Sequence, residues 1–381
     1  MPELTRGAER MSRSGIREIM DLAWSLDGPV IGLHVGEPSF EAPPHVIEAA
    51  RAAYAEGKTH YVPNAGVNAL REAIADKVTR LNGMPTETGQ VVVSAGGAQA
   101  LHAALSLTVG AGDEVLIPDP GWPNYAMAIG LLQATPVRYT LRAENDFRPD
   151  PAALDGLVTD RTKLIIVNSP SNPLGTVLRA DELEALVRFA ERHDLWLLSD
   201  ECYDALTFDV EHVSPGTYDT DGRVISAFSF SKTFAMTGVR VGYLRTTQRI
   251  AGEAAKLQEP MIACVNAAAQ DAAYAALTGP QDAVATMRDT YHYRRDVALA
   301  ELDRLGMGYR RPDGAFYLWV DVGDRDGGDT HRWALDLLRT RGVAVADGPV
   351  FGPAGAGWVR VSLATDTDEL AEGLRRMGEF R

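Results

Sequence analysis

The segment RVISAFSFSKTFAMTGVRVGYLRT, residues 223–246, contains a single lysine between two apolar, β-rich runs. Lys232 follows the first of these runs, in a place where burial is expected. In one interpretation its charged end extends to the surface, as commonly happens to lysines beside apolar residues. In the other, the amine is kept from water, loses proton affinity and forms a Schiff base with a carbonyl compound. The surrounding sequence bears on this choice.

Short β-rich runs alternate with helical patterns from about residue 90 onward. The run TKLIIVNSP (162–170) precedes ADELEALVRFAERH (180–193), where apolar residues recur at helical spacing. Further β-rich runs are QVVVSAGG (90–97), DEVLIPDP (113–120), LWLLSDECY (195–203), RVISAFSFS (223–231) and VRVGYLRT (239–246). This alternation predicts an α/β fold with a largely parallel sheet covered by helices on both faces. Ligands of such sheets bind at the carboxyl ends of the strands.

The pattern changes at about residue 281. A long helix is predicted over 282–305, followed by β-rich runs at 314–322, 342–348 and 358–364, with a further helix among them. We therefore expect a large domain over residues 41–280 and a smaller α+β domain over 281–381. Residues 1–40 are expected to form an N-terminal arm and part of the small domain.

Composition narrows the class of protein. The 381 residues are 45% hydrophobic and 23% charged, which is typical of a globular protein. Lys and Arg total 37 against 52 for Asp and Glu, so the net charge is −15, which argues against binding to nucleic acid or to a membrane surface. The two cysteines predict no disulfide framework. With no secretory signal or membrane span in the sequence, we expect a cytoplasmic location.

Groups suited to binding a phosphate lie near Lys232 in the predicted fold. Ser229 and Arg240 flank the lysine, and both residue types bind phosphate. Gly97 and Ala98 lie at a predicted strand-to-helix turn, where free N–H groups and the helix dipole favour an anion. An anion site and a Schiff-base lysine in one crevice suggest pyridoxal 5′-phosphate (PLP) as the cofactor. No metal site is predicted.

PLP also requires a carboxylate beside its pyridine nitrogen, because a protonated ring takes up electrons. Asp200 ends the apolar run LWLLSD and is placed for this role, although a helix cap or turn carboxylate fits the local sequence equally well. Asn172 and Tyr203 can donate hydrogen bonds to the phenolate oxygen of the ring, and Trp122 can stack on the ring face. Tyr203 and Trp122 are also common packing residues.

In order along the chain, eight segments resemble the conserved blocks of the fold-type I, class I/II aminotransferases, especially the bacterial aspartate/aromatic branch. They are VGEPSF (35–40), HYVPNAGVNALREAI (60–74), GDEVLIPDPGWPNY (112–125), NSPSNPLGTV (168–177), SDECYDAL (199–206), SFSKTFAMTGVRVGY (229–243), GAFYLWVD (314–321) and WVRVSLAT (358–365). The resemblance implies the fold type I architecture, with a mostly parallel seven-stranded sheet between helices and a smaller α+β domain. It also implies a PLP-dependent transaminase that moves an α-amino group between an L-amino acid and a 2-oxo acid by a ping-pong mechanism.

The resemblance assigns roles to residues that match the family's motifs. It implies Lys232 as the Schiff-base lysine, Asp200 as the pyridinium partner, and Tyr203 with Asn172 as partners of the phenolate oxygen. The other roles that it implies are the stacked aromatic (Trp122), the phosphate site (Gly97, Ala98, Ser229 and Arg240), the substrate contacts (Gly36, Trp122, Asn172 and Arg360, which clamps the α-carboxylate) and a tyrosine that reaches the partner subunit's phosphate (Tyr61). The last of these implies a homodimer with shared active sites.

The sequence differs from the family's usual motifs at two positions, and two other functions remain open as alternatives to a transaminase. Leu174 stands where the family usually has threonine, and Ala98 stands where several relatives have a polar residue or lysine. The same motifs also occur in PLP-dependent C–S lyases, synthases and oxidases. A cofactor-sensing regulator would instead need a basic DNA-binding region before these segments, and only about 30 residues precede them.

The substrate side chain is expected to lie near the segments SRSGIREI (12–19) and GAFYLW (314–319). These segments offer Ile16, Phe316 and Tyr317 beside Arg13 and Arg17. No dedicated second cation for an acidic side chain can be assigned from the sequence. We therefore expect dual use, with glutamate or aspartate as one substrate and an apolar or aromatic amino acid as the other.

Overall fold

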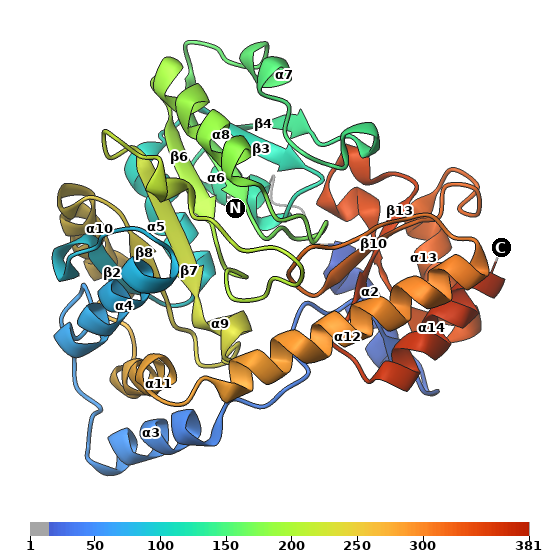
Figure 1. Cartoon of the computed structure of the whole chain (residues 1–381), viewed down its shortest axis with the longest axis horizontal. Helices are drawn as coiled ribbons and strands as arrows, with labels where there is room; N and C mark the ends of the chain where they lie inside the picture. Colours follow the sequence, from blue (N-terminus) through green and yellow to red (C-terminus); the bar gives the residue numbers. More distant parts are fainter. Residues whose placement is uncertain (1–14, 381) are drawn as a thin grey trace, which may run out of the picture.

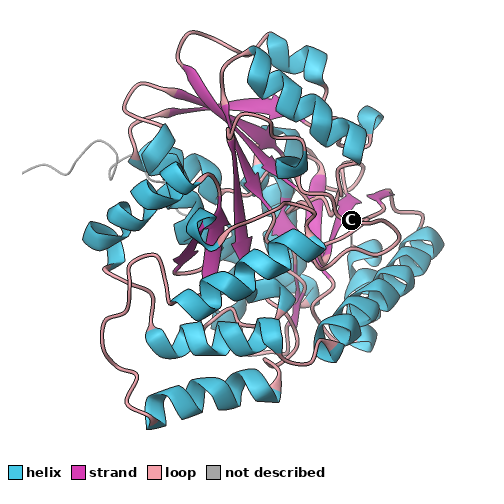
Figure 2. Cartoon of the chain, turned by 60° about the vertical axis from the view of Figure 1, so that its left-hand side comes forward, coloured by secondary structure: helices cyan, strands magenta, loops and turns pink. Residues whose placement is uncertain are grey.

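The structure is a computed structural model, and it describes residues 15–380. A seven-stranded sheet in the order β2-β8-β7-β6-β5-β3-β4 forms its centre (Figures 1 and 2). The strands are β2 (Val91–Ser94), β3 (Glu114–Asp119), β4 (Thr135–Thr140), β5 (Thr162–Asn168), β6 (Trp196–Asp200), β7 (Val224–Ser229) and β8 (Gly242–Arg245). Neighbouring strands from β7 to β4 are parallel, whereas β8 is antiparallel to both β2 and β7. The predicted mostly parallel sheet is confirmed.

Both faces of this sheet are buried. Successive side chains of a strand point to opposite faces, and in these strands both sets of side chains are largely apolar. In β5, Leu164 and Ile166 pack in one hydrophobic cluster with α5 (Gly97–Thr108), α6 (Asn124–Leu131) and α10 (Gln248–Ile262). Ile165 and Val167 pack on the other face, in a cluster with α8 (Ala180–Arg192). The short helix α7 (Pro151–Asp155) precedes β5.

A further helical group covers the β2 end of the sheet. It consists of α3 (Pro44–Ala55), α4 (Asn68–Leu81) and α11 (Ala267–Thr278), which share a cluster with β2 and β8. Between β7 and β8 lies the four-residue helix α9 (Phe230–Thr233), which contains Lys232. The sequence around this lysine thus forms a strand, a short helix and a returning antiparallel strand.

A second, antiparallel sheet has the order β12-β13-β10-β9. Its strands are β9 (Tyr309–Arg310), β10 (Tyr317–Asp321), β12 (Ala346–Asp347) and β13 (Trp358–Ser362), accompanied by α13 (Thr330–Arg341) and α14 (Thr367–Glu379). The run 342–348 is not one strand as expected, because β11 (Val343–Ala344) and β12 belong to different sheets. The strand β1 (Ile31–Gly32), which follows α2 (Gly15–Ser25), pairs in parallel with β11.

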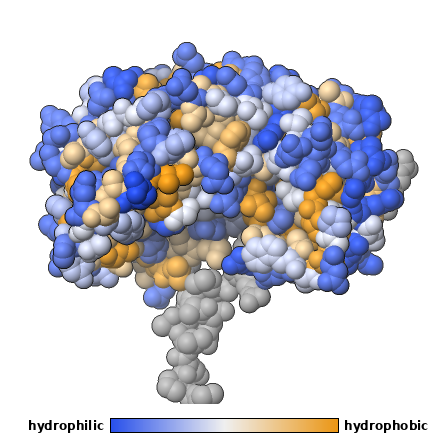
Figure 3. All heavy atoms as spheres, turned by 90° about the horizontal axis from the view of Figure 1, so that it is seen from below, coloured by the Kyte–Doolittle hydropathy of each residue, from blue (hydrophilic) through white to orange (hydrophobic). Residues whose placement is uncertain are grey.

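The long helix α12 (Asp282–Leu305) runs from the α11 side to the second sheet and its helices (Figure 1). Its bounds match the predicted helix, and it ends at Gly306, whose φ of 63° suits a glycine cap. Tyr291, Ala298 and Leu302 bury one face of α12 in the cluster that also holds Ile19 and Leu33. Seen from below, the molecule is hollowed between its two halves (Figure 3).

The packing of α8 gives a test of the fold. Leu186 is 1% exposed and belongs to the cluster between α8 and the sheet, so Leu186→Ala leaves a cavity there and should lower the free energy of unfolding by about 2–5 kcal/mol. Glu184→Ala lies on the solvent side of the same helix and should change it by no more than about 0.5 kcal/mol. Urea unfolding followed by circular dichroism measures both, and equal midpoints for the two variants would contradict this packing.

Candidate functional site

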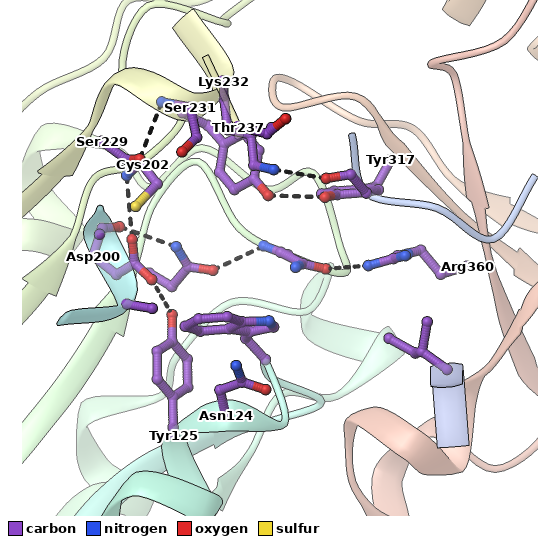
Figure 4. Close-up of a pocket in the computed structure, with 18 of the residues that line it drawn as sticks. Asn124, Tyr125, Asp200, Cys202, Ser229, Ser231, Lys232, Thr237, Tyr317 and Arg360 are labelled. Atoms are coloured by element: carbon purple, nitrogen blue, oxygen red, sulfur yellow. Dashed lines mark hydrogen bonds between the residues drawn. The ribbon is translucent and has the colours of Figure 1, made fainter. Parts of the chain in front are cut away.

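A cavity of about 400 Å³ lies at the carboxyl ends of the parallel strands. Asn168, Asp200 and Ser229 are the last residues of β5, β6 and β7, and all three line it. Arg360 of β13 lines the cavity from the second sheet, so both sheets contribute to one site (Figure 4). This is the edge at which α/β sheets bind ligands.

Lys232 is half-buried in the cavity wall. Its Nζ donates a hydrogen bond to the carbonyl oxygen of Gly36 at 2.7 Å. Burial lowers the pKa of Lys232 from 10.5 to about 8, and the positive charges of Arg360 and Arg240 act in the same direction. The amine is therefore far closer to its free, nucleophilic form at neutral pH than an ordinary lysine is.

Asp200 is a buried carboxylate whose protein partners are neutral. It is 4% exposed, and its Oδ2 accepts a 2.6 Å hydrogen bond from the hydroxyl of Tyr125 while its Oδ1 accepts one from the Cys202 amide at 3.2 Å (Figure 4). Burial is the largest effect on Asp200 and raises its pKa. Among residues 15–380, no Lys, Arg or His forms an ion pair with Asp200, so a cationic group of a ligand would stabilise its charged form.

Arg360 is a buried cation that has no ionic partner among the described residues, just as Asp200 is a buried anion without one. This guanidinium is 2% exposed, donates to Asn172 Oδ1 at 2.9 Å and to the His34 carbonyl at 2.6 Å, and leaves its Nε without a partner among the described residues. Its Cζ lies 4.3 Å from the centre of the Tyr317 ring. Burial lowers the pKa of Arg360, and no carboxylate of the described chain pairs with it. A buried guanidinium of this kind favours a carboxylate ligand.

The tyrosines of the site are linked across the two sheets. The hydroxyls of Tyr203 and Tyr317 are 2.8 Å apart, and both residues line the cavity. Burial raises the pKa of Tyr203 well above its usual value, so the phenol stays protonated and can donate a hydrogen bond. Gly36 is required beside this pair, because a Cβ there would lie 2.5 Å from the Tyr317 hydroxyl.

The start of α5 has the features of an anion-binding site. Gly97 is the first residue of this helix, and Ala98 is the second, so their amides are among the N–H groups without helical partners. Gly96 has a φ of 83°, and a Cβ there would lie 2.5 Å from Nη2 of Arg240. The glycine turn therefore permits the guanidinium to approach the helix start, with Ser229 alongside it in the cavity wall.

All of the predicted site residues line this cavity except Tyr61. Tyr61 is 88% exposed and lies on the surface near Tyr54 and Asn266. Of the residues expected near the substrate side chain, Ile16 and Tyr317 line the cavity, whereas Phe316 is fully buried in the core and Arg17 is exposed and outside the cavity. Arg13 lies outside the described residues. The cavity residues that sequence reasoning did not assign are Asn124, Tyr125, Asn168, Cys202, Ser231 and Thr237.

Tyr125 is the most consequential of these unassigned residues. It lies in GDEVLIPDPGWPNY, so the resemblance offered a signal, but its pairing with Asp200 depends on how α6 is set against β6. Its ring packs edge-on against Trp122, with 5.4 Å between ring centres. Tyr125 therefore holds both the carboxylate and the aromatic that were predicted to contact the cofactor ring.

The described residues contain no cluster of three or more His, Cys, Asp or Glu side chains arranged to hold a metal ion. Cys202 and Cys264 are both free. Across residues 15–380, none of the helices combines the length and hydrophobicity needed to cross a bilayer.

Comparison with known proteins identifies the family. The family model "Aminotransferase class I and II" matches residues 28–377. The chain is 35% identical to an aspartate aminotransferase of Pyrococcus horikoshii and 36% identical to aromatic-amino-acid aminotransferase 2 of Thermococcus litoralis, each match covering 97% of this chain and 96% of the relative. The solved structure of an aspartate aminotransferase from Thermus thermophilus with maleate covers 100% of both chains, at 37% identity and a TM-score of 0.95. The protein belongs to the class I and II aminotransferases and is a transaminase.

Proposed function

We propose that the protein is a PLP-dependent transaminase in which Lys232, Asp200 and Arg360 act on one cofactor and one amino acid at a time. The observation that carries this proposal is a pair of buried opposite charges, Asp200 and Arg360, that have no ionic partner within residues 15–380 and share one cavity with a lysine of lowered pKa. A cationic pyridine ring and an α-carboxylate would satisfy these two charges. PLP, when bound, supplies an electron-accepting ring for the carbon that loses its proton.

The residues present fit this cofactor. The Gly97 and Ala98 amides, Ser229 and Arg240 form a cradle for its phosphate, where a side chain at Gly96 would collide with the guanidinium. Asp200 would bind the pyridine nitrogen, and the Tyr125 hydroxyl donates a hydrogen bond that holds this carboxylate in place. Tyr203 and Asn172 supply polar groups for the ring's phenolate oxygen, and Trp122 supplies a flat apolar surface against the ring.

Lys232 has two functions in this proposal. Its amine would hold the cofactor, and in its free form it would take the proton from the Cα of the bound amino acid. The lowered pKa supports both, because the free amine is both the nucleophile and the base. Arg360 orients the substrate by binding its carboxylate, with Asn172 and Gly36 beside it.

Assembly as a homodimer with shared sites belongs to the same proposal. Tyr61 is 88% exposed, Tyr54 is 54% exposed and Tyr274 is 42% exposed, which are unusual positions for large aromatic residues. An interface over Tyr61 would bring this side chain to the partner's phosphate site.

We also propose the division of the chain into residues 1–40, 41–280 and 281–381, which is supported by the pairing of β1 with β11.

The proposed substrates are glutamate or aspartate as one partner and an apolar or aromatic amino acid as the other. In the described part of the chain the cavity's cations are Lys232, Arg240 and Arg360, and all three have other roles in the proposal. Ile16, Trp122 and Tyr317 offer apolar surface for a side chain. The relatives named for aspartate and for aromatic amino acids support both halves of this pair. A C–S lyase, synthase or oxidase is the second candidate, on the same scaffold.

The pH dependence of Lys232 gives the first test of the site. Because burial lowers its pKa to about 8, acylation of Lys232 in the cofactor-free protein should be half-maximal near pH 8 rather than near 10.5. Peptide mass spectrometry after a brief exposure to acetic anhydride measures the extent, with the exposed Lys256 as the reference lysine in the same digest. A midpoint above pH 10 for Lys232 would contradict the buried amine, as would borohydride attachment of PLP to another lysine.

Substitutions of Asp200 and Tyr125 test whether Asp200 is the residue that keeps the pyridine nitrogen protonated. Asp200→Asn removes the charge that keeps the pyridine nitrogen protonated, so exchange of the substrate's Cα hydrogen with deuterated water should slow by roughly 10²–10³-fold. Tyr125→Phe removes one hydrogen bond to the carboxylate and should slow the exchange by about tenfold. Nuclear magnetic resonance of the loaded enzyme measures both rates. A nearly normal exchange rate in Asp200→Asn would show that another residue keeps the pyridine nitrogen protonated.

Arg360 should matter for every amino acid, because the α-carboxylate is common to all of them. Arg360→Ala is expected to weaken substrate binding by about 2–4 kcal/mol, or roughly 30- to 1000-fold in KM. Arg332→Ala, at a position 79% exposed on α13, is the matched control. Each amino acid is added alone, and the absorbance change of the bound cofactor reports the half-reaction. Release of ammonia or a thiol without this change would favour the lyase or oxidase.

A further inference from the structure

A second cavity, of about 480 Å³, shares a wall with the first. The wall is α9, because Ser231 and Lys232 line the first cavity while Phe230 and Thr233 line the second, and Ser229 lines both. The remaining walls come from α4, β7, β8, the end of α11, the beginning of α12 and the segment after β6 that holds Asp204. The labelled helices and strands lie around α9 in Figure 1.

The inside of this second cavity is largely apolar. Phe228, Phe230, Phe234 and Leu277 contribute to it, and the first three are at most 6% exposed. Thr233, which is 7% exposed, also lines the cavity. A space of this size with apolar walls and a few polar groups is typical of a small-molecule site.

The charges around the second cavity favour an anion. Its lining holds three cations, Lys77, Arg80 and Arg288, and two anions, Asp76 and Asp204, in a chain whose net charge is −15. Lys77 forms a buried ion pair with Asp204, and Arg80 pairs with Asp76 at 2.8 Å. Among residues 15–380, Arg288 pairs with Asp289, which is not part of the lining, so the lining itself holds one more cation than anions.

We infer that this cavity is a second ligand site, for a small organic monocarboxylate with an aromatic or branched apolar body. The apolar body occupies the space between the phenylalanines and α11, and the carboxylate lies toward Arg288. Since α9 forms part of both cavities, an occupant presses on the helix that carries Lys232 and lowers the turnover of the first site.

The binding test uses 3-phenylpropionate as the probe and isothermal calorimetry as the measurement. The full chain with Arg360→Ala is the background, because the first cavity then lacks its carboxylate-binding guanidinium. The probe should bind this protein saturably, and adding Ala285→Phe or Ala73→Leu, which fill the second cavity from α12 and from α4, should abolish binding. Ala300→Phe, at an exposed position on α12, is the matched control and should leave binding unchanged.

Two outcomes of the calorimetry would overturn the inference: no saturable binding in the background, or equal binding with and without the filling substitutions. The two filling variants lie on different helices, α4 and α12, so the test does not depend on one of them folding. Arg288→Gln should lower the affinity for 3-phenylpropionate by about threefold, as expected for a partly exposed charge pair. It should leave 3-phenylpropanol, which lacks the carboxylate, unaffected, and an equal effect on both compounds would contradict the assigned carboxylate position.

The coupling to Lys232 is tested on the loaded enzyme and rests on the proposed function, whereas the calorimetry does not. In otherwise unchanged protein, the probe should raise KM by competing in the first cavity and should also lower kcat through the second. Ala285→Phe should remove the effect on kcat and keep the effect on KM. An effect on kcat that persists in Ala285→Phe, or a probe that binds the second cavity without changing kcat, would contradict transmission through α9.

Discussion

Two buried charges of opposite sign, each without an ionic partner in the described chain, are the constraint on which the rest of the site depends. Asp200 and Arg360 are 4% and 2% exposed, and both line one cavity. Isolated buried charges are costly unless hydrogen bonds or a ligand compensate them. Tyr125, the Cys202 amide, Asn172 and the His34 carbonyl compensate only in part. In the proposed function, a cationic ring and a carboxylate would complete the compensation.

The two charged residues belong to different sheets of the fold. Asp200 ends a parallel strand of the large sheet, and Arg360 belongs to β13 of the second sheet. The Tyr203–Tyr317 hydrogen bond joins the same two parts at the cavity wall. Lys232 lies between them on α9, held by its hydrogen bond to the Gly36 carbonyl from the N-terminal segment. The site therefore exists only when both sheets and the segment around Gly36 are assembled, and any change in their relative position alters all three groups.

Much of this architecture could be predicted from sequence, because apolar runs with polar residues at their carboxyl ends locate both strands and site. The exceptions have physical reasons. β4 gave no clear strand pattern, since it is an edge strand with exposed positions and contains Pro136. Tyr317 is the first residue of β10 and lines the cavity, whereas Phe316 lies in the turn before this strand and is buried in the core. Two adjacent aromatic residues in a sequence do not show where the turn ends and the strand begins. The contact between Tyr125 and Asp200 depends on helix placement, which local sequence does not determine.

We propose that Asp200 and Arg360, which have no ionic partner among the described residues, are matched by one cofactor and one substrate. A crystal structure of the protein with PLP and a non-reactive amino-acid analogue tests it most directly. We expect Lys232 Nζ to be displaced from the Gly36 carbonyl and the pyridine nitrogen to lie within hydrogen-bond distance of an Asp200 carboxylate oxygen. The analogue's carboxylate should bind to the Arg360 guanidinium. A cofactor ring bound away from Asp200, or an analogue carboxylate that leaves Arg360 without an anionic partner, would contradict it.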